Sequence, residues 1–249
     1  MVLLMCIVGL CFGSFLYAWI FRTKDGKSIV HPGSQCVACK HKLSIQDLIP
    51  LVSFFTLRGK CRYCREKISW TSPLVEGLTG VFFAMIFLYH EQQFSLEFVR
   101  DLFVIFFLEC VFFSDWFYGE ISPKWTIVPG LFLFFFSLFF QFHAIFSFVL
   151  GIGVGTLFFL FQFFVSRGKW IGLGDVYMGF FMGVILGFPH ILFALLGAYV
   201  LGALLSIILL AQKKITRKTQ IPFGPFLSVA TFLAMIMGEG ILSFFDFFL

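Results

Sequence analysis

The sequence has very little charge. Only 12% of its 249 residues are Asp, Glu, Lys or Arg, while 60% are apolar. A soluble domain carries about 25% charged and about 45–50% apolar residues. The composition therefore excludes an ordinary cytosolic globule, a disordered chain and a disulfide scaffold. It also argues against nucleic acid as a partner, because nucleic-acid-binding proteins present a strongly basic surface.

Long apolar runs, rich in the 41 phenylalanines, stand where charge is missing. A membrane-spanning helix needs about 20 apolar residues. Residues 1–21 predict a first span and lack the pattern of a cleavable signal peptide, because the basic residues follow the run. Seven more spans are predicted at about 73–89, 98–114, 126–142, 145–165, 173–188, 190–211 and 223–247. The expected fold is an all-α polytopic membrane protein with about eight transmembrane helices in a lipid bilayer.

Residues 22–72 differ from the rest of the chain. They contain ten of the 18 Lys and Arg residues and four of the seven cysteines. This stretch is the only one long and polar enough to form an aqueous module. We therefore divide the chain into a first transmembrane helix (1–21), a cytoplasmic module (22–72) and a seven-helix membrane domain (73–249).

The basic residues also predict the orientation, because cytoplasmic loops are enriched in Lys and Arg. With residues 22–72 inside and eight alternating spans, the other inside segments are 115–125, 166–172 and 212–222. These four segments hold 17 of the 18 Lys and Arg residues, and only Arg100 lies outside. We therefore expect both termini to lie outside.

Two C-x2-C pairs, Cys36 with Cys39 and Cys61 with Cys64, lie in the predicted module. Two close pairs on two turns can supply the four thiolates of a tetrahedral Zn²⁺ site. Because cysteine fills all four positions, no position is open for water, and the predicted Zn²⁺ is structural. Two disulfides or a redox pair are the alternatives, although a cytoplasmic location argues against stable disulfides.

The chain has only 13 acidic residues. Carboxylates inside a membrane are costly, which makes them functional candidates by default. Five of them lie in or at the edges of the predicted spans: Glu76, Glu109, Asp115, Asp175 and Glu239. We interpret the three glutamates as hydrogen-bonding groups between helices. The other acidic residues, Asp47 and Asp101 among them, carry no predicted role.

Asp115 and Asp175 share one geometric property. Asp115 follows a span that runs inward and Asp175 opens a span that runs outward, so topology places both at the cytoplasmic membrane surface. Two carboxylates a few Å apart share one proton, because like charges that close cannot both ionise easily. One can then deprotonate a water while the other protonates the peptide being cut. The pair therefore predicts aspartic-protease chemistry.

Gly172 and Gly174 form a G-x-G-D motif with Asp175. We expect these glycines to support the site by adopting unusual backbone angles and by letting a substrate strand approach closely. A bare four-residue pattern is weak, and its alternative is a glycine-rich loop with a helix cap. Its position at the start of a span, at the same predicted depth as Asp115, favours the functional interpretation.

Several blocks along nearly the whole chain resemble the type IV leader peptidases, the bacterial prepilin peptidases that are G-x-G-D membrane aspartic proteases. The blocks are GSFL at 13–16, both C-x2-C pairs, PLVE at 73–76 with TG at 79–80, Asp115, the motif at 172–175, and PFGPFL at 222–227. The resemblance implies that Asp115 and Asp175 are the catalytic residues and that the membrane domain carries the activity.

The resemblance also implies a substrate and a second activity. Members cut the short basic leader from prepilins or pseudopilins at the cytoplasmic face of the bacterial inner membrane. Many members also methylate the new N-terminus with S-adenosylmethionine. The compact, Phe-rich chain resembles the Gram-positive competence-type members more than the Gram-negative secretion-type ones.

Three positions depart from the family's usual pattern. Tyr17 stands where Asn usually follows GSFL, Tyr177 where a Lys often follows the second aspartate, and Ser122 where Pro is usual, with Pro123 next. The first departure puts any role of that Asn in doubt. The second removes a cation that would lie near the aspartates.

Two other classes of protein are alternatives. Intramembrane carboxylates also serve proton- or ion-coupled transporters, but those commonly carry inverted repeats and broken helices, and no repeat is visible in this sequence. A non-catalytic assembly scaffold that docks through the zinc module is the other alternative. Such a scaffold has no need of two carboxylates at one depth.

Overall fold

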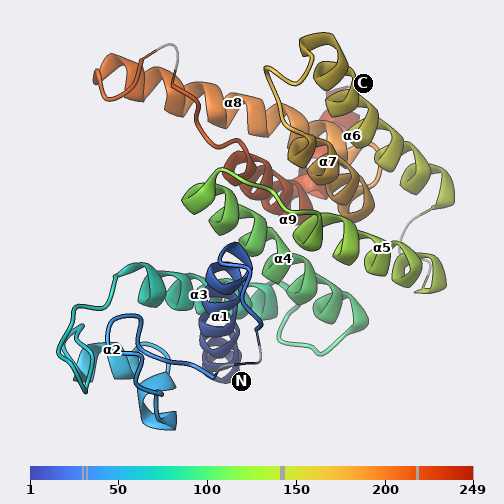
Figure 1. Cartoon of the computed structure of the whole chain (residues 1–249). Helices are drawn as coiled ribbons and strands as arrows, with labels where there is room; N and C mark the ends of the chain where they lie inside the picture. Colours follow the sequence, from blue (N-terminus) through green and yellow to red (C-terminus); the bar gives the residue numbers. More distant parts are fainter. Residues whose placement is uncertain (30, 32, 141–143, 217–218, 249) are drawn as a thin grey trace. The chain divides into compact units, whose positions relative to one another are not determined.

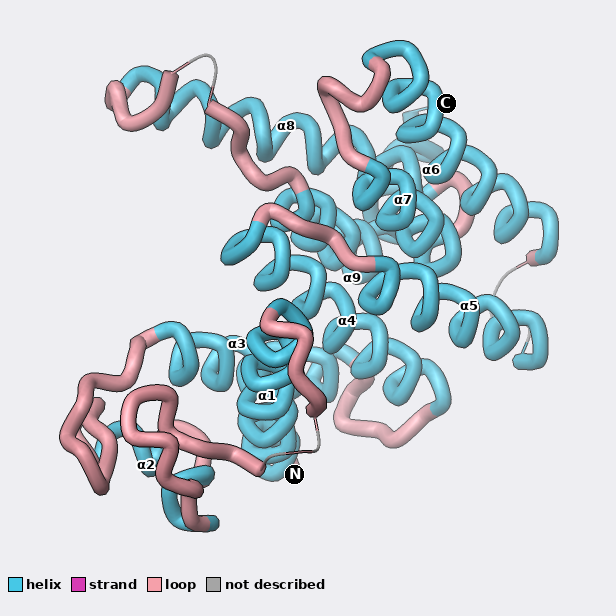
Figure 2. The backbone as a smooth tube through the Cα atoms, viewed as in Figure 1, coloured by secondary structure: helices cyan, strands magenta, loops and turns pink. Residues whose placement is uncertain are grey.

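The computed structural model describes residues 1–29, 31, 33–140, 144–216 and 219–248, with the backbone alone at residues 239 and 241–248. Within these ranges the chain contains helices and loops, no β-strand, and two isolated bridges between loop residues (Figure 2). The predicted all-α class is therefore confirmed. The chain forms two compact units, Met1–Phe106 and Phe107–Leu249.

The first unit contains the cysteine module and one tightly packed helix pair. Its elements are α1 (Val2–Lys24), the 3-10 helix η1 (Ile45–Leu48), α2 (Val52–Thr56), α3 (Thr71–Tyr89) and the beginning of α4 (Leu96–Tyr118) (Figure 1). The backbones of α1 and α3 touch at two glycines of α1. A Cβ at Gly13 would lie 2.7 Å from the Cα of Glu76, and one at Gly9 would lie 2.8 Å from the Cα of Gly80. Small residues at helix contacts are a common means of association in membranes.

The second unit is a helix bundle around α7. It contains the end of α4 and then α5 (Pro123–Phe140), α6 (Ile145–Ser166), α7 (Leu173–Leu186), α8 (His190–Ala211) and α9 (Gly224–Phe248) (Figure 1). Helix α7 packs against α5, α6, α8 and α9, and ten of its 14 residues are buried. The start of α7, where Asp175 lies, is therefore enclosed by other helices.

Glycines also bring α6 and α7 into backbone contact. A Cβ at Gly151 of α6 would lie 2.5 Å from the Cα of Gly187, and one at Gly183 of α7 would lie 2.5 Å from the carbonyl oxygen of Gly151. Gly153, on the same helix, has open space around its position. One face of α6 is thus fitted to α7, while the position of Gly153 tolerates a side chain.

Each of the eight predicted helices has a counterpart in the described ranges, although the predicted end at residue 142 lies outside them. Five helices, α1, α3, α5, α6 and α8, are long and apolar enough to cross a membrane. Helix α7 is apolar but spans only about 21 Å at 1.5 Å per residue, and α4 carries several charges. The predicted three-part division of the chain stays a prediction.

Candidate functional site

The four cysteines of the module come together in the first unit. The Sγ atoms of Cys36, Cys39, Cys61 and Cys64 all lie within 4.8 Å of one another, and those of Cys36 and Cys64 are 3.8 Å apart. Tetrahedral Zn²⁺ with bonds of about 2.3 Å would separate its sulfurs by about 3.8 Å, so the cluster fits such an ion. None of the four forms a disulfide. A hydrogen bond from the backbone of Cys39 lowers the pKa of Cys36 to about 7, which favours the thiolate that a metal binds.

Both cysteine pairs lie in turns of the same design. The N–H groups of Cys36 and Cys61 each donate to the carbonyl five residues later, at 3.0 and 2.8 Å. Lys40 and Arg65, one residue after each pair, take left-handed backbone angles with φ of 59° and 63°. Two similar turns thus face the sulfur cluster, and the sequence announces them only through its C-x2-C spacing.

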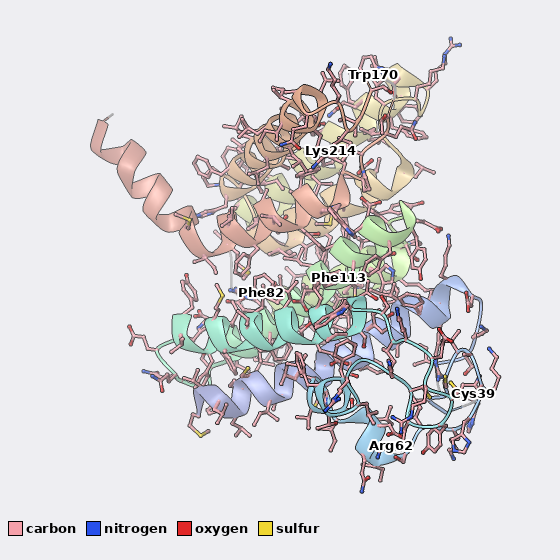
Figure 3. The ribbon with its side chains drawn as sticks, turned by 90° about the vertical axis from the view of Figure 1, so that its left-hand side faces the viewer. Cys39, Arg62, Phe82, Phe113, Trp170 and Lys214 are labelled. Atoms are coloured by element: carbon pink, nitrogen blue, oxygen red, sulfur yellow. The ribbon has the colours of Figure 1, made fainter. Side chains whose placement is uncertain are left out.

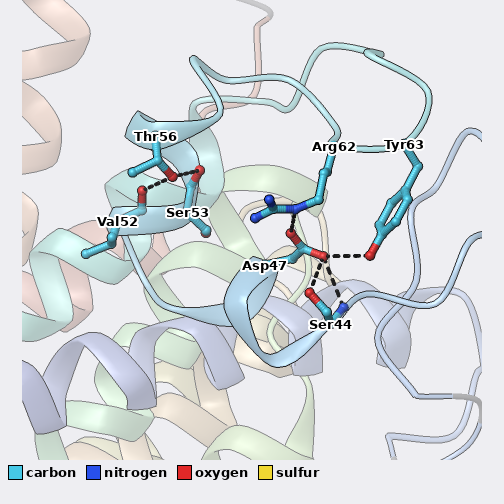
Figure 4. A network of polar contacts seen from close by, with 7 residues as sticks. All are labelled: Ser44, Asp47, Val52, Ser53, Thr56, Arg62 and Tyr63. Atoms are coloured by element: carbon cyan, nitrogen blue, oxygen red, sulfur yellow. Dashed lines mark hydrogen bonds and ion pairs between the residues drawn. The ribbon is translucent and has the colours of Figure 1, made fainter.

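One acidic side chain connects η1 to the second cysteine turn. Asp47 accepts hydrogen bonds from the N–H and hydroxyl of Ser44 at 3.0 and 2.7 Å, from Nε of Arg62 at 2.7 Å and from the hydroxyl of Tyr63 at 3.2 Å (Figure 4). Arg62 and Tyr63 lie between the two cysteines of the second pair. Arg62 is labelled in Figure 3. The Arg62 guanidinium holds the pKa of Asp47 well below its usual range.

Asp115 lies near the end of α4 in the second unit and is buried, with 5% of its surface exposed. Its Oδ2 accepts the backbone N–H of Gly224 at 2.6 Å. Gly224 opens α9, where the N–H groups and the helix dipole favour a carboxylate. A Cβ at position 224 would lie 2.8 Å from the same oxygen. This close approach therefore requires glycine.

Asp175 lies in the first turn of α7 and is 8% exposed. Its Oδ2 accepts the backbone N–H of Gly172, the residue before the helix, at 2.9 Å. Gly172 has ordinary extended angles, and neither it nor Gly174 has a positive φ. The prediction of unusual backbone angles is therefore wrong. Gly174 does permit a close approach, but by the chain itself, because a Cβ there would lie 2.8 Å from the Cβ of Ile121.

The two aspartates are brought together in the second unit. Asp115 and Asp175 are close enough to interact electrostatically, and each is held through Oδ2 by a glycine N–H at the start of a helix. Within the described ranges, neither forms an ion pair with a basic side chain. In the part of the chain that the structure describes, the hydrogen bonds of both carboxyls are made through Oδ2, which leaves Oδ1 of each to meet water or a substrate. That both lie at the cytoplasmic membrane surface stays a prediction.

Sequence reasoning missed two acidic residues with structural partners. Asp47 joins η1 to the second cysteine turn. Asp101 lies 2.9 Å from Nε2 of His90 and accepts a hydrogen bond from Nε of Arg100 at 2.8 Å. Ser44 and Asp47 form the S-x-x-D pattern of a helix capping box, which was a signal for the bonds between these two residues. The bonds of Asp47 to Arg62 and Tyr63, and those of Asp101, become apparent only after folding.

The intramembrane glutamates were predicted to form hydrogen bonds between helices. Glu76 of α3 does accept a hydrogen bond, from the backbone N–H of Leu51 at 2.9 Å. Its partner opens the short helix α2 of the cysteine module and is not part of a second transmembrane helix. The side chain of Glu239 lies outside the described residues.

The apolar helices and the buried carboxylate pair define a multi-pass membrane protein with an acidic site. Comparison with protein families then gives two adjacent matches. Residues 7–90 match the bacterial peptidase A24 N-terminal domain, and residues 102–207 match the type IV leader peptidase family. The chain belongs to the type IV leader peptidase family.

Relatives named prepilin leader peptidase/N-methyltransferase support this membership. One from Bacillus subtilis is 28% identical over 98% of both chains. One from Stutzerimonas stutzeri is 30% identical over 84% of this chain and 73% of the relative, and one from Myxococcus xanthus is 35% identical over 82% and 62%. No solved structure matches the chain.

These findings confirm the resemblance seen in the sequence. The N-terminal match covers the whole cysteine module, and the second match contains both aspartates. The nearly complete coverage of the Bacillus relative agrees with the expected likeness to the competence-type members. The comparisons do not support a transporter.

Proposed function

We propose that the chain is a membrane-embedded aspartic endopeptidase that cuts the basic leader from type IV prepilins or pseudopilins at the cytoplasmic face of the inner membrane. The observation that carries the proposal is the pair Asp115 and Asp175, both buried at helix ends, each held by a glycine N–H and within electrostatic range of the other. Family membership supports the reaction class. The relatives' names supply the substrate, which we extend to this chain.

The geometry suggests how the two carboxyls share the work. Each commits Oδ2 to a glycine N–H, which fixes its orientation and leaves Oδ1 for the reaction. One carboxylate takes a proton from water as the water attacks the scissile carbonyl carbon. The other, protonated, carboxyl gives its proton to the departing nitrogen. The two groups start in different protonation states, because adjacent like charges disfavour double ionisation.

The test compares cleavage of a purified prepilin by the wild type, Asp115→Asn and Asp175→Asn in lipid nanodiscs. General acid–base catalysis contributes typically about 10²- to 10⁴-fold, so we expect each variant to lose at least about 100-fold in rate. Asp25→Asn is the matched control, because Asp25 is an exposed residue of the first unit. Normal cleavage by either folded site variant would refute the assignment.

We also propose that the cysteine cluster holds one structural Zn²⁺. The four sulfurs have the spacing of a tetrahedral thiolate site. When bound, the ion cross-links the two cysteine turns. Metal analysis of the purified protein is expected to give about one zinc per chain, and a content far below that would exclude the site.

The orientation of the site can be tested separately. We propose that the cysteine module and both aspartates face the cytoplasm, on the evidence of the Lys and Arg distribution. Protease added to inverted membrane vesicles should then cut residues 22–72, while right-side-out vesicles should be protected. Cutting in right-side-out vesicles would reverse the orientation.

Methylation of the new N-terminus is a second proposed activity, supported by the names of the relatives. The methyl donor would be S-adenosylmethionine. Mass spectrometry of the mature pilin after reaction with and without this donor tests it. A product that gains no methyl group would remove this activity and leave the peptidase proposal intact.

A further inference from the structure

An aromatic cluster lies beside the bond that holds Asp115. The ring of Phe223, just before α9, has its centroid 5.1 Å from that of Tyr199 in α8 and 6.5 Å from that of Phe159 in α6, both in edge-to-face contact. Tyr199 also meets Phe158 of α6 edge-on at 5.8 Å. Such contacts are worth more than their buried area alone. Phe223 is therefore held between two helices.

The backbone of Phe223 contributes to the direction in which the Gly224 N–H points. That N–H belongs to the peptide unit joining Phe223 to Gly224, and a peptide unit is a rigid plane. The same N–H donates to Oδ2 of Asp115 at 2.6 Å. The carbonyl of this peptide unit accepts the N–H groups of Phe226 and Leu227 at 3.0 and 3.2 Å. A backbone rotation at Phe223 would turn the Gly224 N–H away from the carboxylate, and the ring contacts of Phe223 oppose that rotation together with these two bonds.

Tyr199 is itself fixed by a polar contact. Its hydroxyl donates to Oε1 of Gln162 in α6 at 2.8 Å. Tyr199 also lies within electrostatic range of Asp175. Tyr199 thus contacts Phe223, the residue before Gly224, and lies within electrostatic range of the second carboxylate. The sequence gives no hint of this, because Tyr199 stands in an apolar run.

We propose that Tyr199, held by Gln162, is a positioning residue for the carboxylate pair. The hydrogen bond to Gln162 fixes the ring, the ring holds Phe223, and Phe223 aims the Gly224 N–H at Asp115. This inference rests on the proposed peptidase function. It predicts an effect on the catalytic step, with substrate binding unchanged.

The experiment measures kcat and KM for prepilin cleavage in nanodiscs. Tyr199→Phe removes the hydrogen bond and keeps the aromatic ring, and Gln162→Leu removes the same bond and leaves Tyr199 unchanged. We expect kcat to fall about threefold to tenfold in each variant, with KM unchanged. The double variant should be no slower than the slower single one, because both remove the same bond. Tyr199→Leu also removes the ring contacts and should lower kcat about tenfold or more. Tyr89→Phe, on exposed Tyr89 of α3, is the matched control.

A pH profile separates positioning from a general packing defect. A hydrogen bond from an N–H favours the ionised form of a carboxyl group. If Tyr199→Phe loosens the bond from Gly224, Asp115 ionises at higher pH. The limb of the pH–rate profile that Asp115 determines should then move toward higher pH. Additive losses in the double variant, a rise in KM alone, or values equal to those of Tyr89→Phe would each overturn the inference. If the wild type cleaves and Asp115→Asn does not, such a failure leaves the proposed function standing. A wild type without cleavage would overturn both.

Discussion

The two units of the molecule use aspartates in opposite ways. In the cysteine module, Asp47 receives four hydrogen bonds and an arginine neutralises its charge. In the helix bundle, Asp115 and Asp175 each receive one backbone N–H and, within the described ranges, no basic partner.

The difference separates a structural carboxylate from a reactive one. Asp47 has both oxygens bonded to the protein, which lowers its pKa and fixes two chain segments. A buried carboxyl with an uncommitted oxygen costs free energy. The second unit contains two such carboxyl groups, Asp115 and Asp175, and each carries this cost. We infer that these two positions are kept for chemistry at the expense of stability.

The largest expected effect tests this division of roles directly. Asp115→Asn and Asp175→Asn should lower cleavage by about 10²- to 10⁴-fold and leave the metal as resistant to a chelator as in the wild type. Asp47→Asn should leave cleavage unchanged and make the metal easier for a chelator to remove. A metal that a chelator removes more easily from Asp115→Asn than from the wild type would show that a substitution in the second unit affects the first.

The support of Asp115 comes next in magnitude. A methyl group at Gly224 would meet Oδ2 of Asp115 at 2.8 Å, so Gly224→Ala must displace the carboxylate. Misplacement by about 1 Å costs up to about 100-fold in rate, and we expect a loss of kcat of about tenfold to 100-fold. Gly153→Ala, at an open position of α6, is the control and should retain activity. Equal kinetics for both variants would contradict the role of Gly224.

An effect of similar size, on metal affinity, is expected in the cysteine module. Asp47→Asn weakens the bonds that hold the second cysteine turn to η1, and loss of such outer contacts typically costs about tenfold to 100-fold in metal affinity. Competition with a chromophoric chelator at neutral pH measures it. Unchanged affinity would show that the turns are set by their backbone alone.

The same variant has a defined pH dependence. Because the pKa of Asp47 is lowered in the folded state, its contribution to stability is complete above the ordinary Asp value of about 4 and is lost as the pH falls toward the lower folded value. The difference in unfolding free energy between wild type and Asp47→Asn should therefore be constant above about pH 4 and shrink below it. A difference that shrinks on going from pH 7 to pH 5 would contradict this assignment.

The smallest effect concerns Glu76, which holds the backbone of Leu51. Glu76→Gln keeps an acceptor oxygen for that N–H, whereas Glu76→Leu removes it and should destabilise the module by about 1 kcal/mol. Limited proteolysis of residues 22–72 should therefore be faster for Glu76→Leu than for Glu76→Gln. Equal rates would assign Glu76 a role other than this bond.

Much of the fold could be predicted because it depends on local composition. Apolar runs bounded by charges predicted all eight long helices within a few residues of their observed ends. The cysteine spacing predicted the cluster, because each pair needs only one short turn. Asp115 and Asp175 followed from their rarity and from topology.

The supports of the site could not be predicted in the same way. The donor to Asp115 lies 109 residues away in the sequence, and the contacts of Tyr199 come from α6 and from the residue before α9. Both depend on how helices pack after folding. The glycines around Asp175 show the opposite error, because a motif suggested special backbone angles where Gly172 only caps a helix.

The bond between Asp115 and Gly224 has a consequence for biosynthesis. A chain that emerges from the ribosome carries both aspartates long before it carries the glycine at the start of α9. The nascent protein therefore holds both acidic groups while the donor that orients the first is still missing. We expect chains truncated before residue 222 to insert without cleaving, so that the insertion of the last helix acts as the step that switches the protease on.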